Sequence, residues 1–168
     1  MCQSSDALFH FVICSGVVHN FQTISIGAST LHFTVIIHEL FPHKITNILK
    51  EKGFTNVLVN LGEFNSIGGY EQNRDWNIAT PYLKDIKYIT LNNSALASSG
   101  GYGTKFDENY HHLFDTKTGT SANYINSVTV KAQSATLADA ISTAIFVMPE
   151  NQKEKLKSTY PHIEIYTS

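Results

Sequence analysis

One stretch of the chain, residues 110–119 (YHHLFDTKTG), gathers side chains that could do acid–base chemistry. It carries two adjacent histidines, and a free imidazole titrates near neutral pH, so it can accept the proton of a hydroxyl group. Neighbouring residues of a strand point to opposite faces, so only one of His111 and His112 can serve a given site. Asp115 could orient the histidine ring or form an Asx turn with its own backbone, and Gly119 is placed to take a positive φ in that turn.

A second stretch, residues 136–148 (TLADAISTAIFVM), is mostly apolar and predicts a helix. Asp139 and Thr143 are four residues apart and therefore lie on one face of that helix. A carboxylate and a hydroxyl are hard oxygen donors, which suit Mg²⁺ better than zinc. The alternative is structural, because Thr136 and Asp139 also fit the capping box [ST]-x-x-[DE], with Thr136 as the residue that begins the helix.

Four short motifs, in family order along the chain, resemble those of the FAD:protein FMN transferases, which are also called the ApbE family. With the family pattern after each, they are NVLVNLG at 56–62 (A-L-V-N-L-G-G), ALASSG at 95–100 (A-x-A-T-S-G), HLFDTKTG at 112–119 (H-x-x-D-P-x-T-G) and DAISTA at 139–144 (D-A-x-x-T-A). The resemblance runs from about residue 23 to residue 147. Residues 1–22 match nothing in the family.

The resemblance implies an enzyme that uses Mg²⁺ and takes FAD as its substrate. A Thr or Ser hydroxyl of a target protein attacks the FAD pyrophosphate, FMN becomes esterified to that protein, and AMP leaves. The resemblance assigns the metal to Asp139, Thr143 and the backbone carbonyl of Ala28, and the catalytic role to His112 with Asp115. The residues that it implies for nucleotide binding lie at turns and strand ends: Gly27, Ala28, Asn60, Ser98, Ser99, Gly100 and Thr118.

The chain departs from the family pattern at two turns. Leu31 and His32 stand where the family has a lysine–glycine pair, and Thr116 replaces the proline that follows the aspartate. Little of the chain corresponds to the family's N-terminal half, which has flavin contacts of its own. An alternative therefore stays open, in which the chain is a shortened, noncatalytic member that binds a flavin nucleotide or another protein.

The composition is that of a globular protein. Of the 168 residues, 42% are hydrophobic and 15% are charged, which excludes a disordered chain and fits one domain. The formal net charge is -2 at pH 7 and no basic stripe occurs, so nucleic acid is not an expected partner. Cys2 and Cys14 are the only cysteines, so the sequence contains neither a disulfide framework nor a C-x-x-C metal site, and the compartment stays open.

The remaining pattern predicts an α+β fold, a mainly antiparallel sheet with packed helices, in a single ApbE-like domain over residues 1–168. The apolar run at residues 7–18 lacks the flanks of a signal peptide and is shorter than the roughly 20 residues of a membrane span, so we expect a core strand there. We expect helices at 43–52 (ending at Gly53), 136–148 and 150–158. We expect strands at 23–33 (with a glycine turn), 56–61, 76–79, 87–91, 95–98, 106–114, 127–132 and 163–166.

Overall fold

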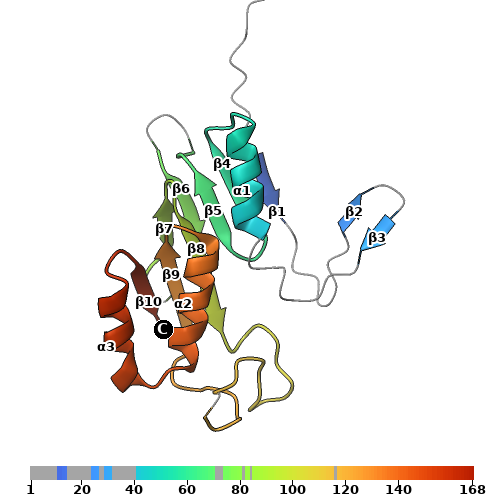
Figure 1. Cartoon of the computed structure of the whole chain (residues 1–168). Helices are drawn as coiled ribbons and strands as arrows, with labels where there is room; N and C mark the ends of the chain where they lie inside the picture. The colour runs from blue at the N-terminus through green and yellow to red at the C-terminus, as the bar shows by residue number, and fades with distance from the viewer. Residues whose placement is uncertain are drawn as a thin grey trace, which may run out of the picture.

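The structure is a computed structural model, and it describes residues 11–14, 24–26, 29–31, 41–70, 74–80, 82–83, 85–115 and 117–168. Its centre is a six-stranded sheet in the order β1-β4-β5-β8-β9-β10 (Figure 1). Only β1 runs parallel to its neighbour, and the other pairs are antiparallel. The six strands are β1 (Phe11–Cys14), β4 (Val57–Asn60), β5 (Phe64–Ile67), β8 (Ala95–Gly100), β9 (Ser127–Ala132) and β10 (Glu164–Thr167).

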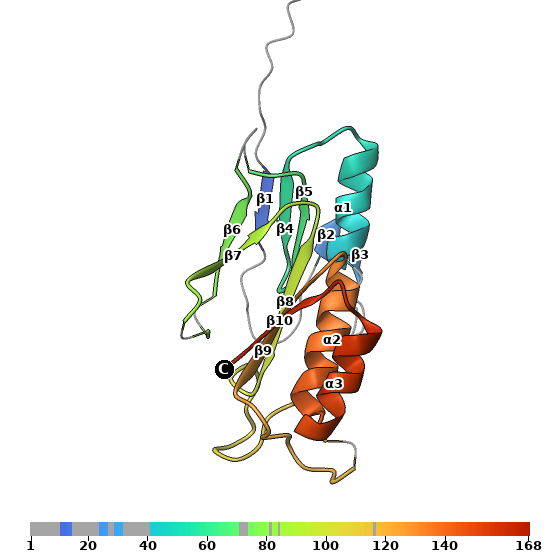
Figure 2. The same ribbon diagram turned by 90° about the vertical axis from the view of Figure 1, so that its left-hand side faces the viewer.

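The sheet is the middle of three layers. Three helices lie on one of its faces and a hairpin lies on the other (Figure 2). The helices are α1 (Phe41–Glu51), α2 (Ala135–Val147) and α3 (Glu150–Thr159). The hairpin pairs β6 (Trp76–Ala79) with β7 (Tyr88–Leu91). A separate two-stranded sheet pairs β2 (Ile24–Ile26) with β3 (Ser29–Leu31). The predicted α+β fold with a mainly antiparallel sheet is therefore confirmed.

Apolar side chains fill the space between these layers. Under the helices, α2 packs on β8 and β9 through buried residues that include Val128, Val130 and Phe146. Under α1, Ile45 and Leu49 contact Val57 and Val59 of β4, as the helical spacing in the sequence predicts. On the opposite face, the β6–β7 hairpin covers the sheet with a third buried cluster: Leu58, Trp76, Ile78, Leu83, Ile89, Leu91 and Leu96.

The two halves of the sheet meet along a short join. Strands β5 and β8 are paired at two positions only, Phe64 with Leu96 and Asn65 with Ala95. By contrast, β8 and β9 are paired over six positions. The join is reinforced beside the strands, because the Ser66 backbone N–H and side-chain hydroxyl both donate to the Ser94 carbonyl, at 2.9 Å and 2.8 Å.

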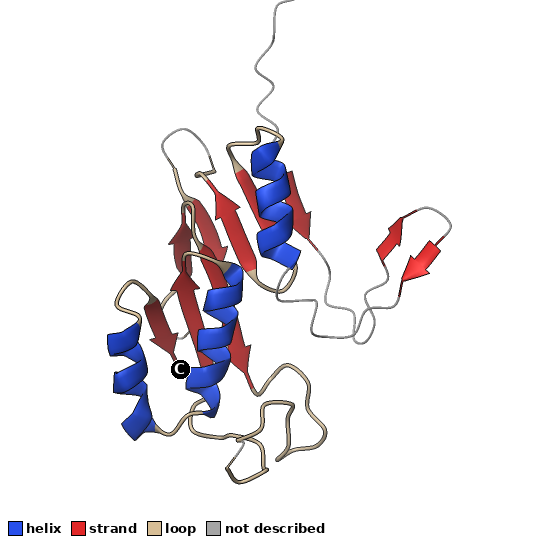
Figure 3. Ribbon diagram, viewed as in Figure 1, coloured by secondary structure: helices blue, strands red, loops and turns tan. Residues whose placement is uncertain are grey.

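Most helix and strand predictions hold, and some do not. Helix α1 begins two residues earlier than expected and ends at Glu51, one residue earlier than expected; the predicted C-terminal glycine, Gly53, follows it with a φ of 87°. The strand predicted at residues 106–114 is wrong: residues 101–115 and 117–126 form loop (Figure 3), with isolated bridges at Lys105–His111 and Phe114–Ser121. Strand β5 was not predicted. Within the described part of the chain, no helix is long and apolar enough to cross a bilayer.

Candidate functional site

The beginning of helix α2 decides which role Asp139 can have. The N-cap is Ser134, whose hydroxyl oxygen accepts a hydrogen bond from the Leu137 backbone N–H at 3.3 Å. Thr136 therefore lies inside the helix, and the expectation that it caps α2 with Asp139 as its capping-box partner is wrong. Asp139 lies beyond the first turn of α2, so it is not the capping-box partner of the Ser134 N-cap, which would be Leu137.

Hydroxyl groups connect α2 with β8 at the level of Thr143. Ser99 Oγ lies 2.7 Å from Ser142 Oγ and 3.2 Å from Thr143 Oγ1, and the Ser142 hydroxyl donates to the backbone carbonyl of Asp139 at 3.0 Å. Ser99 and Ser142 are buried, with 7% and 0% of their surface exposed. The fold thus brings the 95–100 motif into direct contact with the 139–144 motif.

The two adjacent histidines have different surroundings. His111 is buried: its Nε2 lies 3.0 Å from the Ala122 carbonyl, its Nδ1 accepts from the Leu113 N–H at 3.2 Å, and its ring centroid lies 5.5 Å from that of Phe146 on α2. His112 is exposed, and its Nδ1 lies 3.2 Å from the Thr104 carbonyl. Of these two rings, only that of His112 is open to solvent.

Asp115 stabilises the turn that follows the histidines. Its Oδ1 accepts from the Lys117 backbone N–H at 2.8 Å, and its Oδ2 accepts from the Tyr124 hydroxyl at 2.8 Å. Both bonds lower the pKa of Asp115 below its ordinary value, and the bond from the Lys117 N–H has the larger effect. The hydrogen bond between Tyr124 and Asp115 also raises the pKa of Tyr124. The Gly119 N–H donates to the Asp115 carbonyl at 2.8 Å, and Gly119 has the predicted positive φ, 72°. The contacts of Asp115 are those of the Asx turn, which the sequence left open.

The other predicted nucleotide-binding residues are spread over the described structure. Asn60 ends β4, and its Oδ1 accepts from the Gly62 N–H at 3.2 Å. Ser98 Oγ lies 2.8 Å from Thr129 Oγ1, on the face of the sheet opposite to that of Ser99. Gly100 is buried, and a Cβ there would lie 2.0 Å from the Tyr102 ring, while Thr118 is exposed. Gly27 and Ala28 lie outside the described residues.

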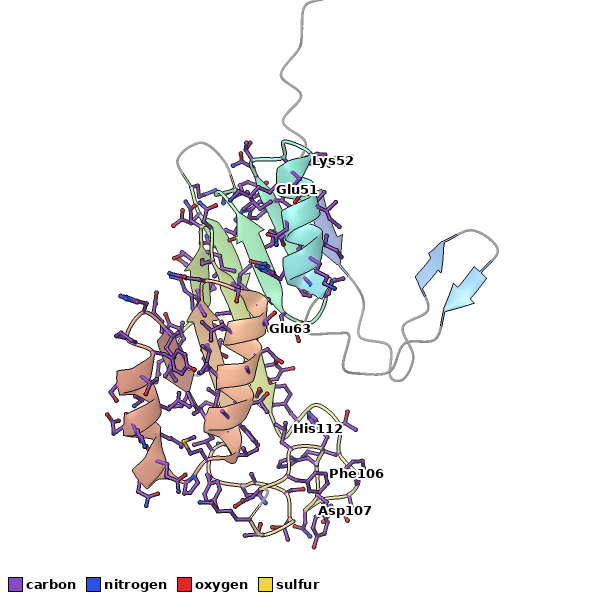
Figure 4. The ribbon with its side chains drawn as sticks, viewed as in Figure 1. Glu51, Lys52, Glu63, Phe106, Asp107 and His112 are labelled. Atoms are coloured by element: carbon purple, nitrogen blue, oxygen red, sulfur yellow. The ribbon has the colours of Figure 1, made fainter. Side chains whose placement is uncertain are left out.

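Figure 4 shows how the turn after β4 relates to the histidine loop. Glu63, next to the Asn60 turn, and His112 both lie on the side of α2 that faces away from α3. A hollow of about 370 Å³ lies between the histidine loop and α2, beside His111, Tyr110, Asn126 and Phe146. Neither Asp139 nor Thr143 lines this hollow.

The ApbE family model matches residues 27–167 of the chain. The chain belongs to the ApbE family. The FAD:protein FMN transferase of Haemophilus influenzae is 32% identical over 120 residues, which cover 65% of this chain and 35% of that protein. The FAD:protein FMN transferase of Treponema pallidum is 25% identical over 167 residues, which cover 89% of this chain and 46% of that protein.

A solved structure of the same family has a similar fold. The flavin transferase ApbE from Vibrio cholerae superposes with a TM-score of 0.62 at 25% identity, over 77% of this chain and 44% of that one. The present ApbE chain therefore spans less than half the length of these relatives. Family membership confirms the resemblance that the four motifs indicated.

The sequence did not reveal three residues that shape this ApbE site: Ser134, Ser142 and Tyr124. Ser142 carried a usable signal, because a serine on the buried face of an apolar helix needs a hydrogen-bonding partner. The partner itself, Ser99, is 43 residues away, and no local pattern identifies it. Tyr124 likewise reaches Asp115 across a turn whose path the sequence does not specify.

Proposed function

We propose that this ApbE chain carries the metal-binding and histidine-bearing part of an FAD:protein FMN transferase. The reaction is the Mg²⁺-dependent transfer of FMN from FAD to a Thr or Ser hydroxyl of a target protein. The observation that best supports it is the contact of Ser99 with Thr143, because it joins two of the family motifs at one place in the fold. The names of the relatives, FAD:protein FMN transferase, supply the reaction class.

The side chains proposed for the metal fit Mg²⁺. Asp139 and Thr143 carry a carboxylate and a hydroxyl one helical turn apart, in a helix whose N-cap is Ser134. Among the described residues, no three His, Cys, Asp or Glu side chains form a group that could hold a metal ion. Mg²⁺ is commonly held by one or two carboxylates together with substrate phosphates, so it does not need such a group. When bound, with the Ala28 carbonyl as a further ligand, Mg²⁺ would neutralise charge on the pyrophosphate.

His112 is the proposed general base. Its Nδ1 lies 3.2 Å from the Thr104 carbonyl and 3.4 Å from the Thr104 backbone N, so Thr104 contacts this ring nitrogen and Nε2 is the one left to the substrate. In the tautomer that donates from Nδ1 to the carbonyl, Nε2 carries a lone pair that can accept a proton. In the reaction, the acceptor hydroxyl oxygen forms a bond to the FMN phosphorus and its proton moves to Nε2. The P–O bond to AMP breaks, and AMP leaves with the electron pair. A positioned base of this kind accelerates a reaction by about 10²- to 10⁴-fold.

The other proposed site residues position these groups or the nucleotide. Asp115 holds the turn after His112 through its bonds to Lys117 and Tyr124. The residues proposed to contact FAD are those at turns and strand ends: Gly27, Ala28, Asn60, Ser98, Ser99, Gly100 and Thr118. The Ser99 hydroxyl is buried and contacts Ser142 and Thr143, so it faces α2.

The test is a transfer assay. The 168-residue chain is incubated with FAD, Mg²⁺ and an acceptor protein that carries a Thr or Ser target motif, and covalent flavin is detected by in-gel fluorescence. We expect labelling that Asp139→Ala abolishes, that His112→Ala lowers by about 10²- to 10⁴-fold, and that a remote substitution, Ser66→Ala, preserves. Labelling that survives Asp139→Ala would contradict the assignment of the metal.

The second function is the noncatalytic one that the sequence left open, in which the chain binds a flavin nucleotide or another protein without transferring FMN. The 168 residues cover 35% and 46% of the two transferases, and a site for a large cofactor normally buries most of that cofactor, so the transfer assay on these residues needs a separate measurement of binding. Calorimetry with FAD separates the two functions: binding without labelling supports the noncatalytic role, and labelling excludes it.

A further inference from the structure

We infer that Ser99 is a positioning residue for the metal site. Its hydroxyl oxygen accepts a hydrogen bond from the Thr143 hydroxyl, and this orientation leaves the lone pairs of the Thr143 oxygen available to the cation. This inference rests on the proposed transferase function, because it concerns the Mg²⁺ site of that function. It departs from the role that the motif alone suggests for Ser99, which is contact with the nucleotide.

The direction of the hydrogen bonds follows from counting protons. A hydroxyl group has one proton to donate. Ser142 donates its proton to the Asp139 carbonyl at 3.0 Å, so we assign Ser142 as the acceptor in its 2.7 Å contact with Ser99, where either hydroxyl could donate on distance alone. Ser99 has then used its own proton, so in the 3.2 Å contact with Thr143 it accepts in turn. The order of donation is Thr143 to Ser99, Ser99 to Ser142, and Ser142 to the helix backbone.

Burial keeps this order in place. Ser142 has none of its surface exposed and Ser99 has 7%, so water is poorly placed to replace either partner. The Thr143 proton points toward β8, and the oxygen keeps lone pairs for a ligand on its open side. A hydroxyl that binds a cation must present a lone pair to it, so this orientation suits a metal ligand.

Removing Ser99 would free the Thr143 side chain. Threonine in a helix divides between two χ1 rotamers, because its hydroxyl can also donate to a backbone carbonyl three or four residues earlier. For Thr143 these are the carbonyls of Ala140 and Asp139. The oxygen would then spend part of its time turned away from the direction that Ser99 now fixes.

The competing explanation is that these hydroxyls only hold α2 against β8. A stability measurement alone cannot separate the two roles, since both predict some destabilisation in Ser99→Ala. Two other measurements can: the χ1 rotamer of Thr143 in the metal-free protein, and the affinity for Mg²⁺. The matched control is Ser66→Ala, which removes another buried serine from the same sheet, one that donates to the Ser94 carbonyl at 2.8 Å.

The rotamer is measured from the three-bond couplings of the Thr143 Cγ2 to the backbone N and C′. The affinity is measured by calorimetry with Mg²⁺ in the presence of FAD, which supplies the phosphate ligands. We expect one rotamer in the wild type and in Ser66→Ala, and averaging in Ser99→Ala. We expect Ser99→Ala to bind Mg²⁺ about 3- to 10-fold more weakly, which is the loss expected for one hydrogen bond, and Ser66→Ala to bind as the wild type does.

Both changes are required. A single Thr143 rotamer in Ser99→Ala, or an unchanged Mg²⁺ affinity, overturns the positioning role while the proposed transferase site stands. A wild-type chain that binds no Mg²⁺, or whose affinity is insensitive to Asp139→Ala, overturns the metal site and the positioning role with it. If Ser99→Ala does not fold, Ser142→Ala serves instead: it releases the Ser99 proton to Thr143, occupies a lone pair, and should weaken Mg²⁺ binding by a similar factor.

Discussion

Replacing His111 by alanine should destabilise the protein by about 3 kcal/mol, whereas the same change at His112 should cost less than about 0.5 kcal/mol. The His111 ring makes two hydrogen bonds, to the Ala122 carbonyl and from the Leu113 N–H, and it packs against Phe146. Each of the two bonds contributes about 1 kcal/mol net, and the ring contact adds roughly another 1 kcal/mol. The exposed His112 ring makes no comparable buried contact among the described residues.

Thermal unfolding of the two variants measures this difference. For a protein of this size, 1 kcal/mol corresponds to a Tm shift of about 2–4 °C, so His111→Ala should lower Tm by about 6–12 °C and His112→Ala by no more than about 2 °C. Equal shifts, or a larger shift for His112→Ala, would refute the assignment of the buried and exposed imidazoles. Transfer assays must therefore compare the two variants below the Tm of His111→Ala, where both are folded.

Three further predictions concern the supporting structure. Ser134→Ala should lower the free energy of unfolding in urea by about 1 kcal/mol, because α2 loses its N-cap, while Ser134→Asp should retain it. The lowered pKa of folded Asp115 stabilises the protein above the ordinary Asp range, and this stabilisation is lost as the pH falls through the lowered pKa. The Tm difference between wild type and Asp115→Asn should therefore be largest near pH 7 and shrink below about pH 4; a constant difference would contradict it. Burial raises the pKa of Tyr102 to about 12, and the charge of nearby Tyr82 adds a smaller effect in the same direction. In an ultraviolet titration, Tyr102→Phe should therefore remove one tyrosine that ionises at higher pH than an ordinary tyrosine.

Local patterns predicted the elements whose hydrophobic spacing agrees with their burial. Strands β6 and β9 have the bounds expected from the sequence, since turn residues flank each of them. Strand β5 escaped prediction because Asn65 and Ser66, at its centre, are polar and yet buried. Their burial is stabilised by the neighbouring strands and by the bonds of Ser66 to Ser94, which lie 28 residues apart in sequence.

The strand predicted at residues 106–114 failed for the opposite reason. Its aromatic residues have high strand propensity, but Phe106 is 64% exposed and Tyr110 is 47% exposed. Burial of these side chains therefore does not stabilise a paired strand here. The same limit applies to the site. The i,i+4 spacing of Asp139 and Thr143 can be read from the sequence. The Ser134 cap depends on the residue at which α2 begins, and the Ser99–Ser142 contact depends on how α2 packs on β8.

The short join between β5 and β8 suggests that the two halves of the sheet open separately. Strands paired at two positions, such as β5 and β8, separate more easily than strands paired at six, such as β8 and β9. Proteins commonly open in units of neighbouring elements that unfold together. In native-state hydrogen exchange, the amides of β4 and β5 should then exchange as one group, and those of β8, β9 and α2 as a slower one. Asn60 belongs to the first group and Ser99, Asp139 and Thr143 to the second. Transient opening of the first group would therefore displace Asn60, a proposed nucleotide contact, while Asp139 and Thr143, the proposed oxygen donors for the cation, stay in place.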